Sequence, residues 1–313
     1  MTGPARTAAT TDGPLHDFAA EVGADDPVVA VGGRTQWTVG GQPDPSAREV
    51  HPPRGVVAHE PAEMIVRVRA GTTVAELDAA LAEGGQTIAL DPADPGRATV
   101  GGILAVGHSG PRRLGWGPAR DTLLEARFVS AEGRLIRAGG PVVKNVTGFD
   151  LCRLLVGSLG TIGLLAEVVL RVRPRPPVAV WLRGEVDDPD RLRHLLFRPS
   201  SILWNGADCW VLLEGHPADV DAEITAIGPG FEPVPRPPAL PDGGRFSVSP
   251  SAIGEVVSAL DPGTFVAEIG VGTVHASTAP PSRQAQPETA ALHRRIKSNF
   301  DPTGRLNPGR MVA

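Results

Sequence analysis

Three glycine-rich segments, each lying between stretches of apolar residues, constrain the fold of this chain more than any other feature. They are Val31–Thr35 (VGGRT), Ala98–Gly110 (ATVGGILAVGHSG) and Gly157–Gly163 (GSLGTIG). Glycine permits positive φ and lets a ligand approach the main chain, so such segments present backbone N–H groups to anions. A single Gly-Gly pair after a strand is more typical of an ordinary turn. Three separated segments of this kind indicate a ligand-binding role as well as turns.

The spacing of these glycines excludes the commonest nucleotide sites. No segment has GxGxxG after a first strand with an acidic residue further on, as a Rossmann site requires. No GxxxxGK[ST] phosphate loop occurs either. We therefore expect one long dinucleotide gripped by several loops, in preference to a single nucleotide on one helix end.

Composition narrows the class of protein further. A length of 313 residues suits about two domains, and a net charge of −5 without a basic stripe argues against nucleic-acid binding. Only Cys152 and Cys209 are present, so no iron–sulfur cluster or cysteine-rich metal site is expected within this chain. The scattered histidines predict no metal site. Without an apolar leader or a long apolar run, we expect a cytoplasmic chain, with docking on a membrane-bound partner left open.

Apolar periodicity predicts two mixed regions. A helix is expected from Leu15 to Val22, strands at Val28–Val31 and Met64–Val68, and a helix that Thr73 and Glu76 begin as a capping box. Leu123–Val129 and Arg134–Ala138 predict a hairpin, Leu151–Leu155 a short helix, and Leu164–Val172 a half-buried strand. Beyond Pro177, strands at about 178–186, 208–214, 245–248 and 264–277 alternate with helices at about 188–196, 217–227 and 250–260. A final helix is expected at Glu288–Phe300.

Several motifs in one colinear order carry a family resemblance. They are Asp91-Pro92, Ala98–Gly102, Ser109–Arg113, Arg120-Asp121, Lys144–Leu151 (KNVTGFDL), Gly157–Gly163 and the closing Phe300–Arg310. Together they resemble the FAD-binding domain of GlcE-type subunits of glycolate oxidases, within the vanillyl-alcohol-oxidase or PCMH-type FAD-binding family. The resemblance covers residues 28–176 and the tail, and covers residues 177–285 poorly.

The resemblance implies an α+β fold with a defined domain order. A flexible N-terminus (1–14) would precede a PCMH-type FAD-binding domain (15–176) with subdomains at about 15–93 and 94–176. A smaller α+β cap domain (177–285) would follow, and a C-terminal segment (286–313) would return to the FAD-binding domain.

Cofactor contacts are carried over position by position. Gly32, Gly33, Arg34 and Thr35 would hold the FAD pyrophosphate; Thr99, Gly101, Gly102, Ser109 and Gly110 the second phosphate and flavin side; and Gly160, Thr161, Ile162 and Gly163 the adenine and ribose. Asn307 would lie near the flavin ring or the domain junction. Relatives that attach FAD through histidine carry it where this chain has Arg34-Thr35-Gln36, so we expect non-covalent FAD. Phe149 stands where the family usually has tyrosine.

A catalytic group is harder to assign. His108 and His275 are candidate bases, although a solvent-facing or backbone-bonded histidine is the commoner reading of His108. Arg112 and Arg113 are suited to a substrate carboxylate, although a surface pair contacting Asp or Glu, or a partner subunit, is the commoner reading. Family members that are dehydrogenases have paired histidines in the cap, whereas His275 is isolated in this sequence.

Three functional hypotheses follow. The first is an FAD subunit of a glycolate oxidase-like complex that oxidises a small 2-hydroxy acid, with a second flavin subunit and an iron–sulfur subunit as partners. The second is a self-sufficient FAD-dependent oxidoreductase of a small alcohol or hydroxy acid. The third is a structural subunit without cofactor, which the three intact glycine-rich segments disfavour.

Overall fold

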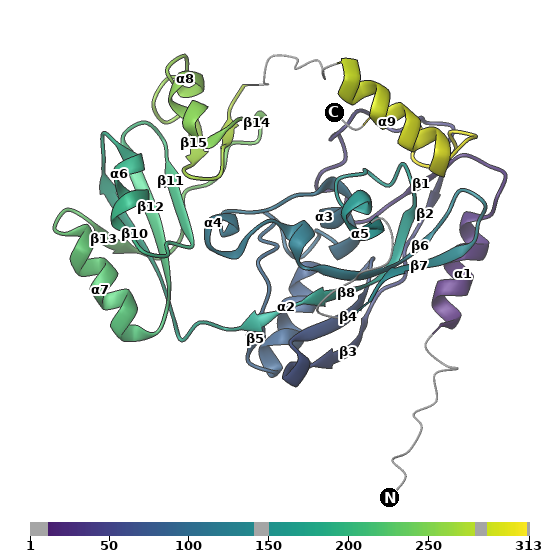
Figure 1. Cartoon of the computed structure of the whole chain (residues 1–313), viewed down its shortest axis with the longest axis horizontal. Coiled ribbons are helices and arrows are strands. Elements are labelled where there is room, and N and C mark those ends of the chain that lie inside the picture. Colours follow the sequence, from purple (N-terminus) through teal and green to yellow (C-terminus); the bar gives the residue numbers. More distant parts are fainter. Residues whose placement is uncertain (1–11, 141–149, 279–286, 312–313) are drawn as a thin grey trace, which may run out of the picture. The chain divides into compact units, whose positions relative to one another are not determined.

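The chain divides into two compact units (Figure 1). The computed structural model describes residues 12–140, 150–278 and 287–311. The first unit comprises the described parts of Met1–His108, Ala119–Pro174 and Gln284–Ala313, and the second comprises Ser109–Pro118 and the described part of Arg175–Arg283. Most of the Lys144–Leu151 motif, including Phe149, lies outside the described residues. No helix in the described ranges is long and apolar enough to cross a membrane.

A five-stranded antiparallel sheet forms the centre of the first unit. Its order is β3 (Val56–Glu60), β4 (Ile65–Arg69), β8 (Leu164–Arg171), β6 (Leu123–Val129) and β7 (Leu135–Gly139). The helices α2 (Val74–Glu83), α3 (Val100–Val106) and α5 (Leu151–Leu155) share one hydrophobic core with this sheet. A short pair, β5 (Gln86–Thr87) and β9 (Arg173–Pro174), closes one end. The predicted hairpin, capping box and short helix are thereby confirmed.

The capping box begins α2 as the sequence predicts. Thr73 Oγ1 accepts a hydrogen bond from the Glu76 main-chain N–H at 3.3 Å, and Thr73 N donates to Glu76 Oε2 at 2.9 Å. These reciprocal bonds satisfy two N–H groups that the first helical turn would otherwise leave unpaired.

A smaller layer carries the N-terminal part of the same unit. The parallel strands β1 (Val28–Ala30) and β2 (Arg48–Val50) pack with α1 (Gly13–Val22) around a separate core. Leu306 from the C-terminal tail lies in this core and forms a bridge to Val28. The tail therefore completes the layer that the N-terminal residues begin.

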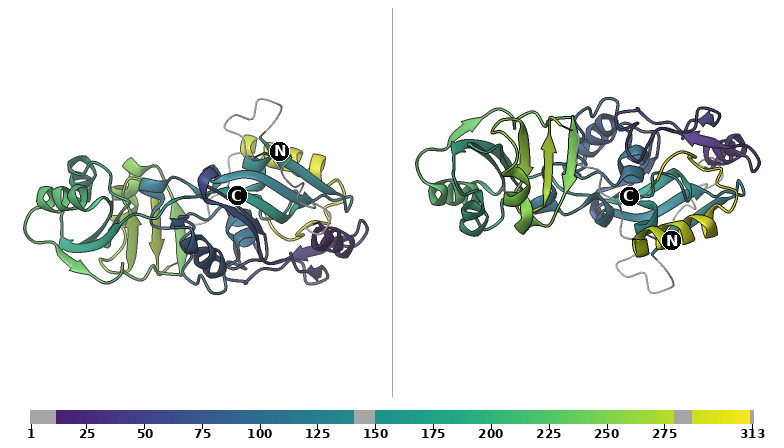
Figure 2. Two further views of the ribbon diagram at one scale, coloured as in Figure 1. Left: turned by 90° about the horizontal axis from the view of Figure 1, so that it is seen from below. Right: turned by 90° about the horizontal axis from the view of Figure 1, so that it is seen from above.

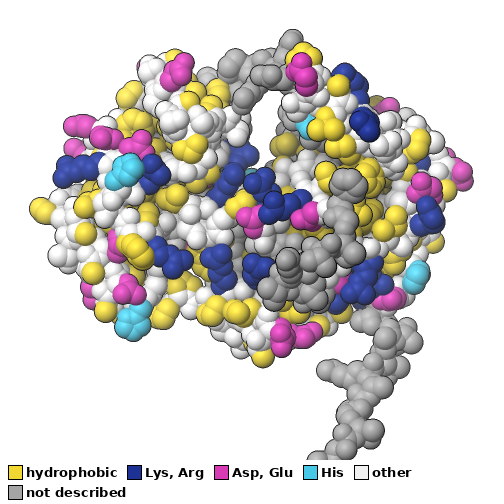
Figure 3. Space-filling view, in the orientation of Figure 1, with side chains coloured by type: hydrophobic (Ala, Val, Ile, Leu, Met, Phe, Trp, Pro, Cys, Tyr) yellow, Lys and Arg dark blue, Asp and Glu magenta, His cyan; other side chains and the backbone are white. Residues whose placement is uncertain are grey.

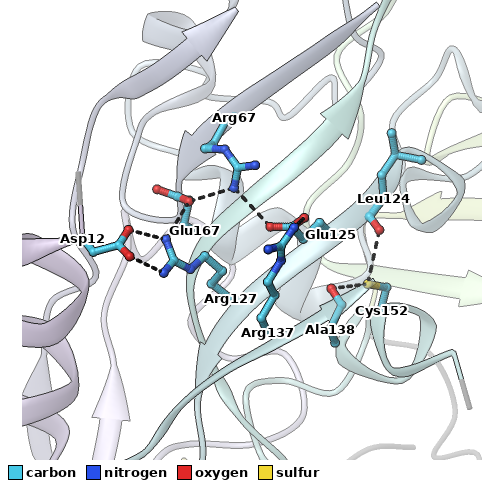
Figure 4. Close-up of polar contacts among 9 residues, drawn as sticks. All are labelled: Asp12, Arg67, Leu124, Glu125, Arg127, Arg137, Ala138, Cys152 and Glu167. Atoms are coloured by element: carbon cyan, nitrogen blue, oxygen red, sulfur yellow. Dashed lines mark hydrogen bonds and ion pairs between the residues drawn. The ribbon is translucent and has the colours of Figure 1, made fainter. Parts of the chain in front are cut away.

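The prediction for β8 was wrong in one respect. The sequence pattern indicated a half-buried strand, but every residue of β8 except Arg171 is buried. The reason is its central position between β4 and β6, where the buried Glu167 is compensated by ion pairs. Its carboxylate lies 3.1 Å from Arg67 and 3.5 Å from Arg127 (Figure 4).

Further charges extend this network across the sheet. Glu125 pairs with Arg67 at 3.1 Å and with Arg137 at 2.7 Å, and Asp12 binds Arg127 through both carboxylate oxygens (Figure 4). The hydrogen bond from Arg127 lowers the pKa of Asp12. Two buried glutamates are thus tolerated because arginines on neighbouring strands neutralise them.

The second unit contains a seven-stranded sheet with helices on one face (Figure 2). The order is β13 (Glu232–Val234), β10 (Val178–Glu185), β12 (Asp208–Gly215), β11 (Ser201–Trp204), β15 (Phe265–Glu268), β16 (Thr273–Ala276) and β14 (Gly244–Ser247). The helices α6 (Pro189–Leu195), α7 (Pro217–Ile227) and α8 (Ile253–Val257) cover the core, and α4 (Arg113–Trp116) lies against β11.

Two predictions for this unit need correction. The single strand expected at about 264–277 is the hairpin β15–β16, because Gly270 and Gly272 take φ of 80° and 90° and turn the chain. The sequence pattern also missed the short strands β11 and β13.

On the face drawn in Figure 3, basic and acidic side chains are intermixed on both units.

The C-terminal helix α9 (Pro287–Phe300) leads into a tail anchored by buried polar side chains. Arg305 is only 2% exposed and donates hydrogen bonds to the carbonyl oxygens of Val22, Asp26 and Ala131. Asp301 accepts from the main-chain N–H groups of Arg305 and Leu306. One arginine thereby joins the tail to the end of α1, to the segment before β1 and to the turn between β6 and β7.

Replacing Arg305 with methionine should destabilise the protein strongly. Three carbonyl groups would lose their donor, so we expect the free energy of unfolding to fall by about 2–4 kcal/mol. Urea or thermal unfolding measures the loss. The control is Arg295→Met, because Arg295 is exposed and forms no ion pair within the described ranges. Equal losses for the two variants would contradict the anchoring role.

Candidate functional site

A cleft in the first unit brings the glycine-rich segments and the tail together. Its lining comes from four places in the sequence: Ala30 and residues 32–37, then Thr99, Gly102, Ala105 and Val106, then Leu159, and finally Asn307 and Arg310. Of the residues predicted to hold the cofactor, Gly32, Gly33, Arg34, Thr35, Thr99, Gly102 and Asn307 therefore line one site.

The first segment presents a run of main-chain donors. Val31 N donates to Val50 O at 2.9 Å, but the N–H groups of residues 32–36 have no acceptor among the described residues. The side-chain oxygen of Gln36 is also buried without a partner in that part of the chain. Residues 32–36 are exposed or half-buried, so these N–H groups are open to solvent or to a ligand. Successive backbone donors of this kind suit an anion that accepts several hydrogen bonds at once.

Glycine is required at the start of this run by close packing. A Cβ atom at Gly32 would overlap the side chain of Thr99, and one at Gly33 would overlap the carbonyl oxygen of Arg97. Main chain thus lies directly against main chain where the first segment crosses the second. A side chain at Gly33 would push the donor run away from its observed position.

Three residues of the cleft share an uncommon backbone conformation. Arg34, Leu159 and Asn307 have φ of 56°, 55° and 45°, and they are three of five described non-glycine residues with positive φ. Such conformations persist where the surroundings enforce them, and they concentrate at functional sites. Because three of these residues line the cleft, the backbone conformation indicates a functional site there, in addition to the evidence from the cleft's shape.

Asn307 connects the tail to the other walls of the cleft. Its Oδ1 accepts from Ala30 N at 2.9 Å, and its Nδ2 donates to Leu159 O at 2.5 Å. The side chain is buried and its amide already has partners on both sides. Its observed contacts are therefore with the protein, and it holds the β1 end and the third segment together.

Sequence reasoning missed the aromatic centre of this cleft. Two guanidinium groups lie against the Trp37 ring, with Arg34 4.6 Å and Arg310 5.0 Å from its centroid. Arg310 also donates to the carbonyl oxygens of Trp37 and Val39, and burial lowers its pKa. Arg34 in turn binds both carboxylate oxygens of Glu49 at 2.5 Å. The lack of any motif around Trp37 explains why the sequence did not reveal it.

The third segment also borders a larger cavity of about 670 Å³. Ser158, Thr161 and Ile162 line it, opposite Ile296 and Lys297 of α9. Neither Gly160 nor Gly163 lines this cavity or the first cleft. A Cβ at Gly160 would meet Asn307, and one at Gly163 would meet Phe128, so these two glycines permit packing.

The second segment is partly helical, contrary to the expected loop. Thr99 caps α3, and its Oγ1 accepts from Gly102 N at 3.2 Å. Gly101 is buried against Ala70, whereas Gly102 faces the cleft. His108 is half-buried at the end of the segment, and Ser109 and Gly110 are buried within the second unit.

In the second unit the predicted arginine pair separates into two environments. Arg112 lies 3.7 Å from Glu214 and stacks on Trp116, whose Nε1 donates to Glu214 at 2.8 Å. Arg113 is half-buried, and its side chain has no acceptor in the described ranges. The two neighbours in sequence therefore do not act as one carboxylate clamp.

His275 has no neighbouring histidine in the sequence, but it pairs with a carboxylate in the fold. Its Nε2 lies 2.7 Å from Oε1 of Glu268, and the two residues are 6% and 1% exposed. The missed signal was the hairpin: Glu268 and His275 lie seven positions apart on adjacent strands, β15 and β16. Within the described residues, no group of three or more His, Cys, Asp and Glu side chains is placed to hold a metal ion.

Comparison with known proteins identifies both parts of the chain. Residues 18–139 match the family model described as FAD binding domain, and residues 253–311 match the one described as FAD linked oxidases, C-terminal domain. Glycolate oxidase subunit GlcE of Escherichia coli (strain K12) is 34% identical over 209 residues, which are 64% of this chain and 60% of that protein. A D-lactate dehydrogenase of Archaeoglobus fulgidus is 39% identical over 108 residues, 34% of this chain and 24% of that one.

Solved structures agree on the fold. An alkyldihydroxyacetonephosphate synthase superposes with a TM-score of 0.65 at 16% identity, covering 97% of this chain and 75% of that one. A carbohydrate oxidase from Microdochium nivale gives 0.53 at 18% identity, covering 67% and 48%. In the sequence comparisons, the matched region spans less than two thirds of the length of GlcE and of the D-lactate dehydrogenase.

Both thiols should be inert in the folded protein. Burial raises the pKa of Cys152 to about 11 and that of Cys209 to about 12, so almost no thiolate exists at pH 8. We expect no reaction with Ellman's reagent at pH 8 in buffer and two reactive thiols per chain in denaturant. Rapid labelling of a native thiol would contradict the burial of these side chains.

Proposed function

The chain belongs to the FAD-linked oxidoreductase family, and from that premise we propose that it is the FAD-binding subunit of a glycolate oxidase-like complex. In this proposal it holds non-covalent FAD and takes part in the two-electron oxidation of a small 2-hydroxy acid. The bound FAD supplies the redox chemistry, and the residues of this chain bind and orient it.

The observation that carries the proposal is the donor run at residues 32–36. A pyrophosphate offers many acceptor oxygens and negative charge, which five successive N–H groups without acceptors match. The glycines at 32 and 33 fix this run against Thr99 and Arg97. We assign the FAD pyrophosphate to this run, with Thr99 and Gly102 beside it.

The remaining cofactor contacts are assigned from the lining of the larger cavity and from the family resemblance. Thr161 and Ile162 would border the adenine and ribose, which is supported by their place in the wall of the larger cavity. For Gly101, Gly160 and Gly163 the packing described above favours a structural role close to the cofactor. Ser109 and Gly110 stay assigned to the flavin side through the family resemblance.

Non-covalent attachment is supported by the composition of the cleft. Its described lining contains neither histidine nor cysteine. Arg34 replaces the histidine that attaches FAD in some relatives, and its guanidinium is bound to Glu49. Both cysteines are buried in hydrophobic cores.

The partners follow from the relative's name and from the cysteine count. GlcE is a subunit of glycolate oxidase, so a complex with a second flavin subunit and an iron–sulfur subunit is proposed here. With two buried cysteines, this chain offers no set of thiolates for a cluster of its own. In this proposal the iron–sulfur partner passes the electrons onward.

A second candidate function is a self-sufficient FAD-dependent oxidoreductase. The Glu268–His275 pair favours it, because a histidine oriented by a buried carboxylate is an arrangement suited to accepting a proton. The two candidates differ in one measurement, since only a self-sufficient enzyme would have its flavin bleached by glycolate without partners.

Substitution of Gly33 by alanine should remove the cofactor. The new Cβ would collide with the Arg97 carbonyl, and a displacement costing more than about 1.4 kcal/mol lowers affinity tenfold or more. The ratio of flavin to protein absorbance after purification measures retention. Gly13→Ala is the matched control, because a Cβ there meets nothing within 4 Å. Equal flavin content in both variants would exclude the proposed pyrophosphate site.

Acid precipitation tests the mode of attachment. We expect all flavin to appear in the supernatant as FAD, since the described lining of the cleft contains no histidine or cysteine that could bond to the flavin. Yellow colour that stays in the precipitate would show a covalent link and overturn the non-covalent assignment.

A further inference from the structure

The cleft and the larger cavity of the first unit meet at one side chain. They are lined by different segments, and Arg310 is the one residue of the described ranges that lines both. Its neighbours in the tail lie on either side of this junction, since Asn307 borders the cleft and Met311 borders the cavity. A ligand that extends from the cleft into the cavity therefore passes Arg310.

The guanidinium of Arg310 is fixed by three contacts. Nη1 donates to the carbonyl oxygen of Val39 at 2.9 Å, Nη2 donates to that of Trp37 at 2.8 Å, and the group lies 5.0 Å from the centroid of the Trp37 ring. Each of these nitrogens carries a second N–H group, which has no acceptor in the described ranges. A cation held in place in this way loses little conformational freedom when a ligand binds.

The charge of Arg310 is not neutralised by a carboxylate. This residue forms no ion pair within the described part of the chain, whereas Arg34 in the cleft is bound to Glu49 and Lys297 in the cavity to Asp301. Arg310 is half-buried, and burial lowers its pKa because the charged form loses contact with water. A half-buried guanidinium without a carboxylate is suited to a phosphate group, whose oxygens accept its N–H groups.

We propose that Arg310 binds the adenosine-side phosphate of FAD and thereby makes the site select FAD over FMN. The inference rests on the proposed function, in which the donor run at residues 32–36 binds the pyrophosphate and Thr161 and Ile162 border the adenine and ribose. The phosphate between those two parts then belongs at the junction of cleft and cavity, where Arg310 lies. FMN has one phosphate and no adenosine, so it offers nothing to this guanidinium beyond the flavin side.

Three ligands separate the contributions of the two ends of FAD. FMN keeps the flavin and one phosphate, and ADP keeps both phosphates and the adenosine without the flavin. Isothermal titration of each into flavin-free, full-length protein measures its affinity without any turnover. We expect wild type to bind FAD roughly tenfold or more tightly than FMN, and to bind ADP in competition with FAD.

Substitution of Arg310 should affect only the ligands that carry adenosine. In Arg310→Gln we expect FAD and ADP to bind roughly tenfold more weakly and FMN to bind as in wild type. A purely structural role, in which Arg310 only holds residues 37–39, would instead weaken FMN as much as FAD. Arg310→Lys keeps the charge and should retain part of the affinity for ADP.

The control is Arg295→Gln, which removes the same charge from α9. Arg295 is exposed, has no ion pair among the described residues and lines neither the cleft nor the cavity. This variant should bind all three ligands like wild type.

The outcomes separate this inference from the proposed function. An unchanged preference for FAD over FMN in Arg310→Gln, or an equal loss for both flavins, would overturn the inference while wild type still binds FAD. Binding of ADP that depends on Arg310, in a chain that takes up no flavin, would uphold the phosphate contact and reject the flavin function. Failure of wild type to bind either FAD or ADP would reject both.

Discussion

In the first unit, the main chain at Gly33 lies so close to the Arg97 carbonyl that no side chain fits between them. The same closeness recurs at Gly32 with Thr99 and at Gly160 with Asn307. These approaches fix the distance between segments far apart in the sequence. Residues 32–36 line the cleft, and their N–H groups have no acceptor among the described residues. The proposed binding site therefore depends on glycines, which have no side chain, as much as on the side chains that line it.

The C-terminal tail holds this arrangement closed. Arg305 donates to two carbonyl groups of the N-terminal layer and to one in the β6–β7 turn, and Asn307 connects β1 to the third glycine-rich segment. Lys297 adds hydrogen bonds to the carbonyls of Thr161 and Leu306. The last residues of the chain therefore complete a site that the first hundred residues begin. Loss of the tail would remove the bonds by which Asn307 joins two walls of the cleft.

Signals within a few residues of the sequence were sufficient to predict much of the first unit. The capping box at Thr73 and the glycine-rich segments act over a few residues, so they are visible in the sequence. The partner of His275 was not, because Glu268 becomes its neighbour only when Gly270 and Gly272 turn β15 into β16. Similarly, the separation of Arg112 from Arg113 depends on Glu214, a residue about one hundred positions away. Trp37 and Arg310 meet only after the tail has returned.

The central claim is that the run of N–H groups at residues 32–36 binds the pyrophosphate of FAD. The most direct test compares FAD with riboflavin, which has the same ring but no phosphate, by titrating each into flavin-free protein. The account predicts that FAD binds at least a hundredfold more tightly, or about 2.7 kcal/mol, and that Gly33→Ala removes this difference. Equal affinity for the two flavins would show that the phosphates contribute nothing and would contradict the account.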